Sequence, residues 1–229
     1  LRPEDIIPGY ENFDISGGPS FQIHGLTPKM RKAVGDFMVW DKGKNQAVPI
    51  LDNLNFDVRA GEIVGIAGVS GNGQSELLEI LSGIRGFDSG SIVLNGREVT
   101  PDNAINPKEV RTLRAAHVPE DRHRLGLVTN FTAEESVILG YQDSDHYNHG
   151  LLLDRSRINQ ECQRLMDAFD VRPRIPEIRS ANMSGGNQQK LILAREFDKG
   201  PEVLLVGQPT RGVDIGAIEF IHGQLLEHR

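Results

Sequence analysis

The stretch Gly68-Val69-Ser70-Gly71-Asn72-Gly73-Gln74-Ser75 decides the fold of this chain. It follows residues 63–67 (IVGIA), an apolar run that predicts a strand buried on both faces. Leucines at helical spacing follow it. A glycine-rich turn between strand and helix is typical of a phosphate-binding loop, because backbone N–H groups and the helix N-terminus then face the anion. We therefore expect an α/β domain that binds phosphate groups. An ordinary glycine-rich turn is the alternative for this loop taken alone.

Two positions of the loop bear on its chemistry. Ser75 stands where a hydroxyl group would reach Mg²⁺, whereas Gln74 replaces the lysine of a standard phosphate-binding loop. Glutamine can donate hydrogen bonds to phosphate but brings no positive charge, which matters in a site that holds several negative charges.

Composition limits the classes of function. The chain has 229 residues, 38% of them hydrophobic, which suffices for one large domain or two coupled lobes. A net charge of −7 is a poor match for nucleic acid or an anionic membrane surface. No apolar run approaches the roughly 18 residues that span a bilayer, so we expect any link to a membrane to pass through a partner protein. The single cysteine fits a reducing cytosol.

The pattern along the chain predicts its organisation. Residues 1–33, rich in proline, glycine and polar side chains, predict a linker, and residues 34–229 predict the folded domain. Residues 125–197 predict a helical lobe, in which an apolar stripe marks one helix: Ile158, Cys162, Leu165, Met166 and Phe169. Further strands are predicted at 37–40, 51–58, 91–94 and 203–206, and a helix at 215–226. This order predicts an α/β sheet domain with an inserted helical lobe.

Two more motifs follow in the second half of the chain. The first, Met183-Ser184-Gly185-Gly186-Asn187, opens a helical run; Ser184 can cap the helix, and the glycines let backbone N–H groups approach an anion. The second, Gly207-Gln208-Pro209-Thr210-Arg211-Gly212-Val213-Asp214, comes directly after the strand predicted at 203–206.

In this order the motifs resemble those of ATP-binding cassettes of the ABC family. The resemblance implies a P-loop ABC ATPase with a RecA-like sheet core, an antiparallel β subdomain and an inserted helical lobe. It implies ATP and Mg²⁺ as cofactors, with Ser75 on the metal. It makes residues 183–187 the signature motif, which acts on a partner's ATP, and Asp214 the D-loop aspartate, although Asp214 as a plain cap residue is the alternative. The nucleotide-binding residues that it implies are Trp40, Gly68, Ser70, Gly71, Asn72, Gly73, Gln74 and Ser75. Trp40 would stack on adenine, and an ordinary core position is its alternative.

By the same resemblance, three positions lack the side chain that the family uses, and a fourth carries a different one. Gly207 and Gln208 stand where the family has the aspartate that orders Mg²⁺ and the catalytic glutamate, and Gln74 replaces the lysine. Glycine offers no ligand, and glutamine can orient a water but cannot accept its proton. No catalytic residue is therefore expected to be intact. Glu120 replaces the usual glutamine of the coupling loop, which senses the γ-phosphate and touches the transmembrane partner; a charged surface loop is the alternative.

In detail, residues 118–122 (VPEDR) and the pair Gly207-Gln208 resemble the second, C-terminal cassette of tandem importers for simple sugars and purine nucleosides, closest to the nucleoside branch. This implies three partners: an N-terminal cassette of the same polypeptide, transmembrane permease subunits and, indirectly, an extracellular substrate-binding protein, with no nucleic acid. The expected location is the cytoplasmic face of the cell membrane. We expect a piece of a longer chain that ends before the family's switch histidine, and weak or no activity of the fragment alone. A non-transport regulatory cassette, acting as a nucleotide-gated clamp, is the rival; a P-loop kinase or GTPase is disfavoured by the signature.

Overall fold

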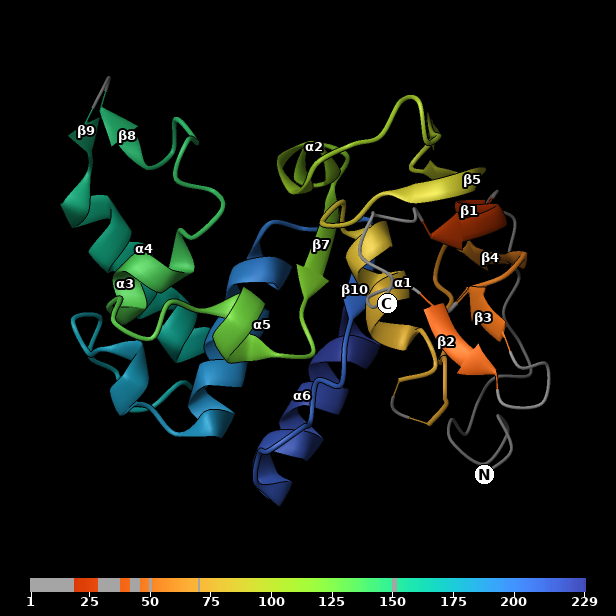
Figure 1. Ribbon diagram of the computed structural model, residues 1–229. Helices are drawn as coiled ribbons and strands as arrows, with labels where there is room; N and C mark the ends of the chain where they lie inside the picture. Colours follow the sequence, from red (N-terminus) through yellow and green to blue (C-terminus); the bar gives the residue numbers. More distant parts are fainter. Residues whose placement is uncertain (1–18, 29–37, 42–45, 50, 70, 150–151) are drawn as a thin grey trace.

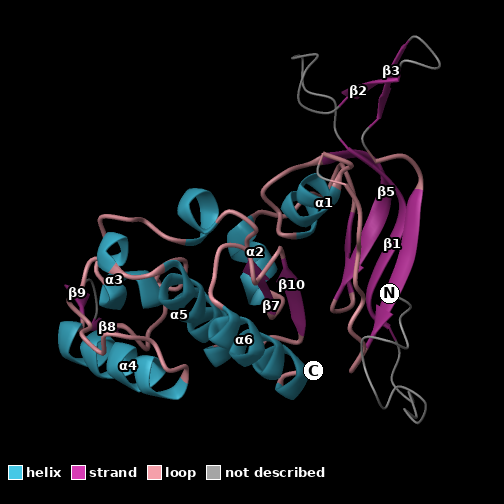
Figure 2. Cartoon of the chain, turned by 90° about the horizontal axis from the view of Figure 1, so that it is seen from below, coloured by secondary structure: helices cyan, strands magenta, loops and turns pink. Residues whose placement is uncertain are grey.

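The computed structural model describes residues 19–28, 38–41, 46–49, 51–69, 71–149 and 152–229. An antiparallel sheet stands at one side of the molecule and a helical lobe at the other, with a parallel pair of strands between them (Figure 1, Figure 2). The predicted α/β class with an inserted helical lobe is confirmed. Among the described residues, no helix is both long and apolar enough to cross a membrane.

The antiparallel sheet has the strand order β4-β1-β5-β6. Its strands are β1 (Pro19–Pro28), β4 (Leu54–Arg59), β5 (Phe87–Leu94) and β6 (Arg97–Val99). The β5–β6 turn places Asn95 and Gly96 at φ values of 45° and 79°, the left-handed conformations that a two-residue hairpin turn needs. A separate hairpin joins β2 (Met38–Asp41) to β3 (Gln46–Pro49). The strand predicted at 91–94 is therefore confirmed, and the strand predicted at 37–40 is confirmed for its described residues, 38–40. The strand predicted at 51–58 is confirmed from Leu54 onward, whereas residues 51–53 precede it.

The linker predicted over residues 1–33 was wrong for Pro19–Pro28, which forms β1. This strand pairs with β4 on one edge and β5 on the other. Its stability comes from these long-range ladders, which no local periodicity in the sequence reveals. Residues 1–18 and 29–33 lie outside the described part of the chain.

The central pair consists of the parallel strands β7 (Ala115–Val118) and β10 (Val203–Val206). Helices α1 (Gln74–Leu81), α2 (Pro107–Thr112) and α5 (Gly185–Asp198) pack against this pair, and α6 (Ile215–Glu227) packs against α5 (Figure 1). The core beside the antiparallel sheet includes Leu77 and Ile80 of α1 together with Leu205 of β10. The strand predicted at 203–206 and the helix predicted at 215–226 are confirmed.

The strand predicted at 63–67 was wrong. These residues form no regular strand, and Ile63, Val64 and Ile66 are 39%, 41% and 54% exposed. A strand buried on both faces needs neighbours that satisfy its backbone groups, and within the described residues the parallel ladder contains only β7 and β10. The apolar run is therefore not sufficient to form a strand here.

The helical lobe packs around a second core, which also includes Val118 of β7 and Ile221 of α6. It contains a π-helical turn η3 (Arg122–Gly126), α3 (Ala133–Val137), α4 (Arg155–Ala168), a 3₁₀ turn η4 (Ser180–Asn182) and α5 (Gly185–Asp198). The whole apolar stripe of α4 predicted from the sequence is buried. A short hairpin of β8 (Asn148–His149) and β9 (Leu152–Leu153) was not predicted.

Side-chain caps fix where most of these helices begin. Asn106 and Glu109 form a capping box on α2, and Thr132 and Glu135 form another on α3. Three further helices are each capped by one side-chain oxygen that accepts a backbone N–H. These oxygens belong to Asp154 on α4, Ser184 on α5 and Asp214 on α6. The two later caps matter for the site, since they set the first turns of α5 and α6.

Candidate nucleotide-binding site

The glycine-rich loop turns into α1 through left-handed backbone. Gly71 and Gly73 have φ values of 89° and 100°, which side chains rarely tolerate, and the Asn72 N–H donates to the Val69 carbonyl over 3.2 Å. Gly73 is the N-cap of α1 and has no side chain, so no cap side chain covers the N–H groups of the first turn. These groups suit an anion. Ser70 lies outside the described residues.

Gln74 lies back across this loop. A Cβ atom built at Gly68 would stand 1.9 Å from Gln74 Nε2, so the approach of the carboxamide requires glycine at position 68. The side chain that replaces the expected lysine therefore packs against the loop backbone.

The structure brings Ser75 and Glu120 together. Ser75 Oγ donates to Glu120 Oε2 over 2.7 Å, although the residues are 45 positions apart. Arg211 Nη1 lies 3.5 Å from Glu120 Oε1. All three line a polar cavity of about 140 Å³ beside α1. Both predicted positions thus belong to one site, whereas Arg211 had no predicted role.

Gly207 and Gln208 have different surroundings. The Gly207 N–H donates to the Val118 carbonyl over 2.8 Å, and a Cβ atom at Gly207 would lie 2.8 Å from Glu120 N and 2.9 Å from Leu78 Cδ1. No larger residue fits there without movement. Gln208 is exposed, and its φ of 42° lies in the left-handed region.

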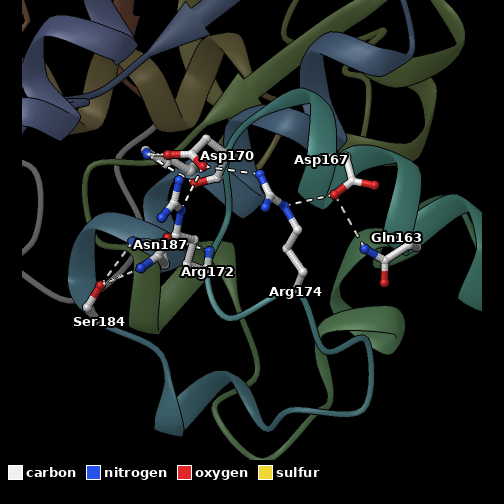
Figure 3. Close-up of polar contacts among 8 residues, drawn as sticks. Gln163, Asp167, Asp170, Arg172, Arg174, Ser184 and Asn187 are labelled. Carbon is white, nitrogen blue, oxygen red and sulfur yellow. Dashed lines mark hydrogen bonds and ion pairs between the residues drawn. The ribbon is translucent and has the colours of Figure 1, made fainter.

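The signature motif presents an exposed serine. Ser184 Oγ accepts from Asn187 Nδ2 over 2.8 Å and from the Asn187 N–H over 3.4 Å. Asn187 Oδ1 accepts in turn from the Arg172 N–H over 2.7 Å, so the amide is fixed from both sides (Figure 3). Among the hydrogen bonds of the described residues, Ser184 Oγ only accepts. Its hydroxyl hydrogen therefore remains available to an outside acceptor.

The loop of residues 170–174, whose Arg172 N–H binds Asn187, is held together by ion pairs. Arg172 and Arg174 both contact the Asp170 carboxylate, and Lys190 Nζ on α5 lies 3.3 Å from it (Figure 3). The hydrogen bond from Arg172, followed by the contacts with Lys190, lowers the pKa of Asp170. The Asp170 carboxylate therefore stays ionised and paired with these cations near neutral pH.

Arg122 ties three segments together. Its Nε donates to Gln188 Oε1 over 3.1 Å and its Nη1 donates to the Arg211 carbonyl over 2.9 Å. A Cβ atom at Gly185 would lie 2.7 Å from Arg122 Nη2 and 2.8 Å from the Gly212 carbonyl oxygen. Glycine in the signature thus allows this close approach. The sequence analysis assigned no role to Arg122, and the only local signal is its place next to Glu120 and Asp121.

Three further predicted positions are Asp214, Trp40 and Met183. Asp214 Oδ1 accepts from the Ala217 N–H over 2.9 Å, so its reading as a helix cap is confirmed, and its Oδ2 lies 3.0 Å from a Cβ built at Gly186. Trp40 lies on β2 opposite Ala47, but its side chain is outside what the structure describes. Met183, the first residue of the signature, is buried, 5% exposed.

Comparison with known proteins decides the family. The family described as ABC transporter matches residues 51–211, the span that holds the loop, the coupling segment and the signature.

The chain belongs to the ABC transporter family.

Relatives within this family include proteins named for import. The chain is 46% identical over 177 residues to the nucleoside import ATP-binding protein NupA of Lactococcus lactis subsp. cremoris, covering 77% of this chain and 34% of that protein. It is 41% identical over 184 residues to the guanosine import ATP-binding protein NupO of Bacillus subtilis, covering 80% and 36%. The chain therefore spans about a third of the length of these ABC relatives.

Solved structures agree on the ABC fold. A dimeric post-hydrolysis state of the cassette MJ0796 bound to ADP and Pi superposes with a TM-score of 0.68 at 20% identity, over 90% of this chain and 81% of that one. A nucleotide-free ABC transporter cassette gives a TM-score of 0.68 at 17% identity, over 92% and 77%. At these identities the likeness concerns the fold, and it confirms the predicted ABC ATPase architecture.

We expect Arg122→Lys to loosen the segments that Arg122 joins. Lysine keeps the charge but lacks the planar fork, so it cannot reach both the Arg211 carbonyl and Gln188 Oε1. Hydrogen exchange should rise severalfold over residues 185–188 and 208–213, with a stability loss of about 1 kcal/mol. Arg97→Lys, at an exposed position of β6, is the matched control. Unchanged exchange in Arg122→Lys would contradict this role.

We also expect His117 to make the fold sensitive to acid. Burial, opposed by the negative charge of Glu196, lowers the pKa of His117 to about 4. The folded state therefore keeps the imidazole neutral between about pH 4 and 6.5, while the unfolded state takes up a proton, so stability falls as pH drops through this window, by up to about 3 kcal/mol. Urea unfolding at pH 7 and 4.5 should show a smaller pH effect in His117→Gln than in the parent. The exposed His146→Gln is the control, and equal pH effects in His117→Gln and the parent would refute the prediction.

Proposed function

We propose that this chain is the ATP-binding cassette of an importer for nucleosides or simple sugars, and the second of two cassettes in one polypeptide. The names of its relatives support the substrate class, and their length, more than twice that of this chain, supports a tandem arrangement. The proposed partners are the N-terminal cassette, transmembrane permease subunits and, through them, a substrate-binding protein, at the cytoplasmic face of the cell membrane. The observation that carries the proposal is the contrast between a depleted phosphate-binding side and an ordered, outward-facing signature.

The depleted side is the chain's own nucleotide site. Gln74 brings no charge, Gly207 has no side chain, and Gln208 has no carboxylate. This site has no base to take the proton of the attacking water. It therefore binds nucleotide weakly, or binds it without turnover, and does not hydrolyse it. The isolated chain is then weakly active or inactive.

The ordered side acts in trans. In this proposal two cassettes meet head to tail, and each ATP lies between the phosphate-binding loop of one and the signature of the other. The helices that follow the glycine-rich loop and the signature belong to different cores: α1 packs with the antiparallel sheet, and α5 packs with the helical lobe. This separation supports the use of the two motifs at separate sites. Ser184 would donate its free hydroxyl hydrogen to the γ-phosphate of ATP on the partner cassette. Mg²⁺ bound with that ATP would neutralise phosphate charge. Water would attack the γ-phosphorus, the bond from the γ-phosphorus to the bridging oxygen would break, and ADP would leave, giving ADP and phosphate.

A regulatory cassette that works as a nucleotide-gated clamp is the second candidate. Its usual targets carry nucleic acid, and the net charge of −7 disfavours such a surface. Co-purification separates the two: permease subunits support the importer, and ribosomes would support the clamp.

We expect Ser184→Arg to stop ATP turnover by the intact two-cassette protein. Arginine at this exposed helix N-cap removes the hydroxyl donor and fills the face that would meet the partner's ATP, so turnover should fall at least tenfold. Ser89→Arg, on an exposed position of β5, is the matched control. Undiminished turnover in Ser184→Arg would contradict the proposed role of the signature at the partner's ATP.

A subtler change reverses one hydrogen bond. Asn187→Asp keeps the shape of the side chain, but its carboxylate can only accept, so the Ser184 hydroxyl would turn inward and donate to it. We expect kcat of the intact protein to fall about tenfold, with unchanged far-UV circular dichroism. Asn187→Leu removes the same tie without adding charge and should also reduce kcat, whereas the exposed Asn103→Asp should not. A normal kcat in Asn187→Leu would show that the amide does not position Ser184.

A further inference from the structure

Arg211 has no role in the sequence motifs, but in the structure it shares a carboxylate with Ser75 at the start of α1. We propose that Arg211 supplies the positive charge that Gln74 lacks, and that its guanidinium group binds phosphate oxygens of the nucleotide in this chain's own site. The inference rests on the proposed function, since it concerns how that depleted site binds nucleotide.

Arg211 reaches the cavity beside α1 from the segment that follows β10. Ser75 Oγ donates to Glu120 Oε2 over 2.7 Å, and Arg211 Nη1 lies 3.5 Å from the other oxygen of that carboxylate, Oε1. The hydroxyl group and the guanidinium group are thus separated by a single carboxylate. Because Ser75 lies in the first turn of α1, whose N–H groups suit an anion, phosphate held there would lie within reach of Arg211.

The charges around this cavity call for a cation. Among the described residues that line it, the carboxylates belong to Glu79, Glu120 and Asp121, and the guanidinium groups belong to Arg124 and Arg211. The carboxylates outnumber the cations, so the cavity would repel phosphate oxygens. Gln74 stands in place of the family's lysine and adds no charge. The cation that receives phosphate must therefore come from one of the two arginines.

Arg211 is the better placed of these two arginines. Arg124 Nη1 lies 3.9 Å from Glu79, a carboxylate that also pairs with Arg85 over 2.6 Å. Glu79 stands about one helical turn beyond Ser75 on α1, away from the end that suits an anion. Arg211 instead contacts the carboxylate that is bonded to Ser75 itself. Of the two, Arg211 is thus the cation beside the phosphate-binding end of the helix.

The backbone of Arg211 is fixed, whereas its side chain is loosely held. Its N–H donates to the Gln208 carbonyl over 3.0 Å, and its own carbonyl accepts from Arg122 Nη1 over 2.9 Å. The side chain is 62% exposed, and its contact with Glu120 is long for a hydrogen bond. The guanidinium group can therefore turn from Glu120 to phosphate without backbone movement. Its planar fork matches two phosphate oxygens, which a lysine ammonium group does not.

Photolabelling with an azido-ATP tests this without relying on turnover. After crosslinking of the intact protein, mass spectrometry of its peptides distinguishes label on this chain from label on the partner cassette. We expect Arg211→Gln to weaken labelling of this chain about tenfold, the size expected when a hydrogen bond between charged groups is lost. Arg97→Gln, at an exposed position of β6, removes the same charge elsewhere and should label like the parent. Unchanged labelling of Arg211→Gln overturns the inference.

Two further measurements separate the charge of Arg211 from an effect on folding. Gln74→Lys in the Arg211→Gln background returns a cation to the same site and should restore most of the labelling; no recovery would overturn the exchange of charge between positions 74 and 211. An azido-AMP label carries fewer phosphate groups, so Arg211→Gln should weaken its labelling much less. An equal loss with both labels would indicate a general distortion of the site and overturn the phosphate contact.

The outcomes also distinguish this inference from the proposed function. Weaker labelling in Arg211→Gln with normal turnover in Ser184→Arg would preserve the role of Arg211 and reject the trans role of the signature. Parent-like labelling in Arg211→Gln with lost turnover in Ser184→Arg would reject the role of Arg211 alone.

Discussion

The parallel ladder between β7 and β10 is the constraint on which the rest of the site depends. Its register pairs Val206 with Val118, and the Gly207 N–H extends the ladder by donating to the Val118 carbonyl over 2.8 Å. Because parallel strands end at the same edge, the segments that leave them must run side by side. One segment carries Glu120 and Arg122, and the other carries Gly207 and Arg211. Their close contact follows from four paired residues in each strand.

From this edge, polar contacts reach both halves of the molecule. Toward α1, Glu120 accepts from Ser75. Toward α5, Arg122 binds Gln188, and Gln188 in turn donates to the Ser180 carbonyl over 2.8 Å. The segment that follows β7 thus contacts α1 through Glu120 and α5 through Arg122, two positions further on. A displacement of this segment would have to break at least one of these contacts, which gives the proposed permease contact a physical route to both nucleotide half-sites.

Local features of the sequence predicted much of this architecture, because their causes are local. The apolar stripe of α4 and the cap at Ser184 each depend on neighbouring residues, and both are confirmed. The errors concern strands: β1 forms where composition predicted a linker, and residues 63–67 form none where an apolar run predicted one. Strand formation depends on partners far along the chain, and periodicity carries no record of them. The roles of Arg122 and Arg211 were missed for the same reason, since their partners lie 66 and 91 positions away.

The four departures that the family resemblance implies fit the proposed function when they are taken together, as a change in chemistry at constant charge. Relative to that pattern, Gln74 loses one positive charge and Glu120 gains one negative charge, whereas Gly207 and Gln208 each lose one negative charge. Two replacements make the site more negative by one unit each and two make it less negative by one unit each, so its formal charge is unchanged. A site that had simply decayed would be under no constraint to balance these changes. Binding of Mg-ATP depends on the net charge and on the oxygen donors, while hydrolysis depends on a base at one position. Loss of the base at constant charge is the combination that the proposed role of this site, holding nucleotide without hydrolysing it, requires.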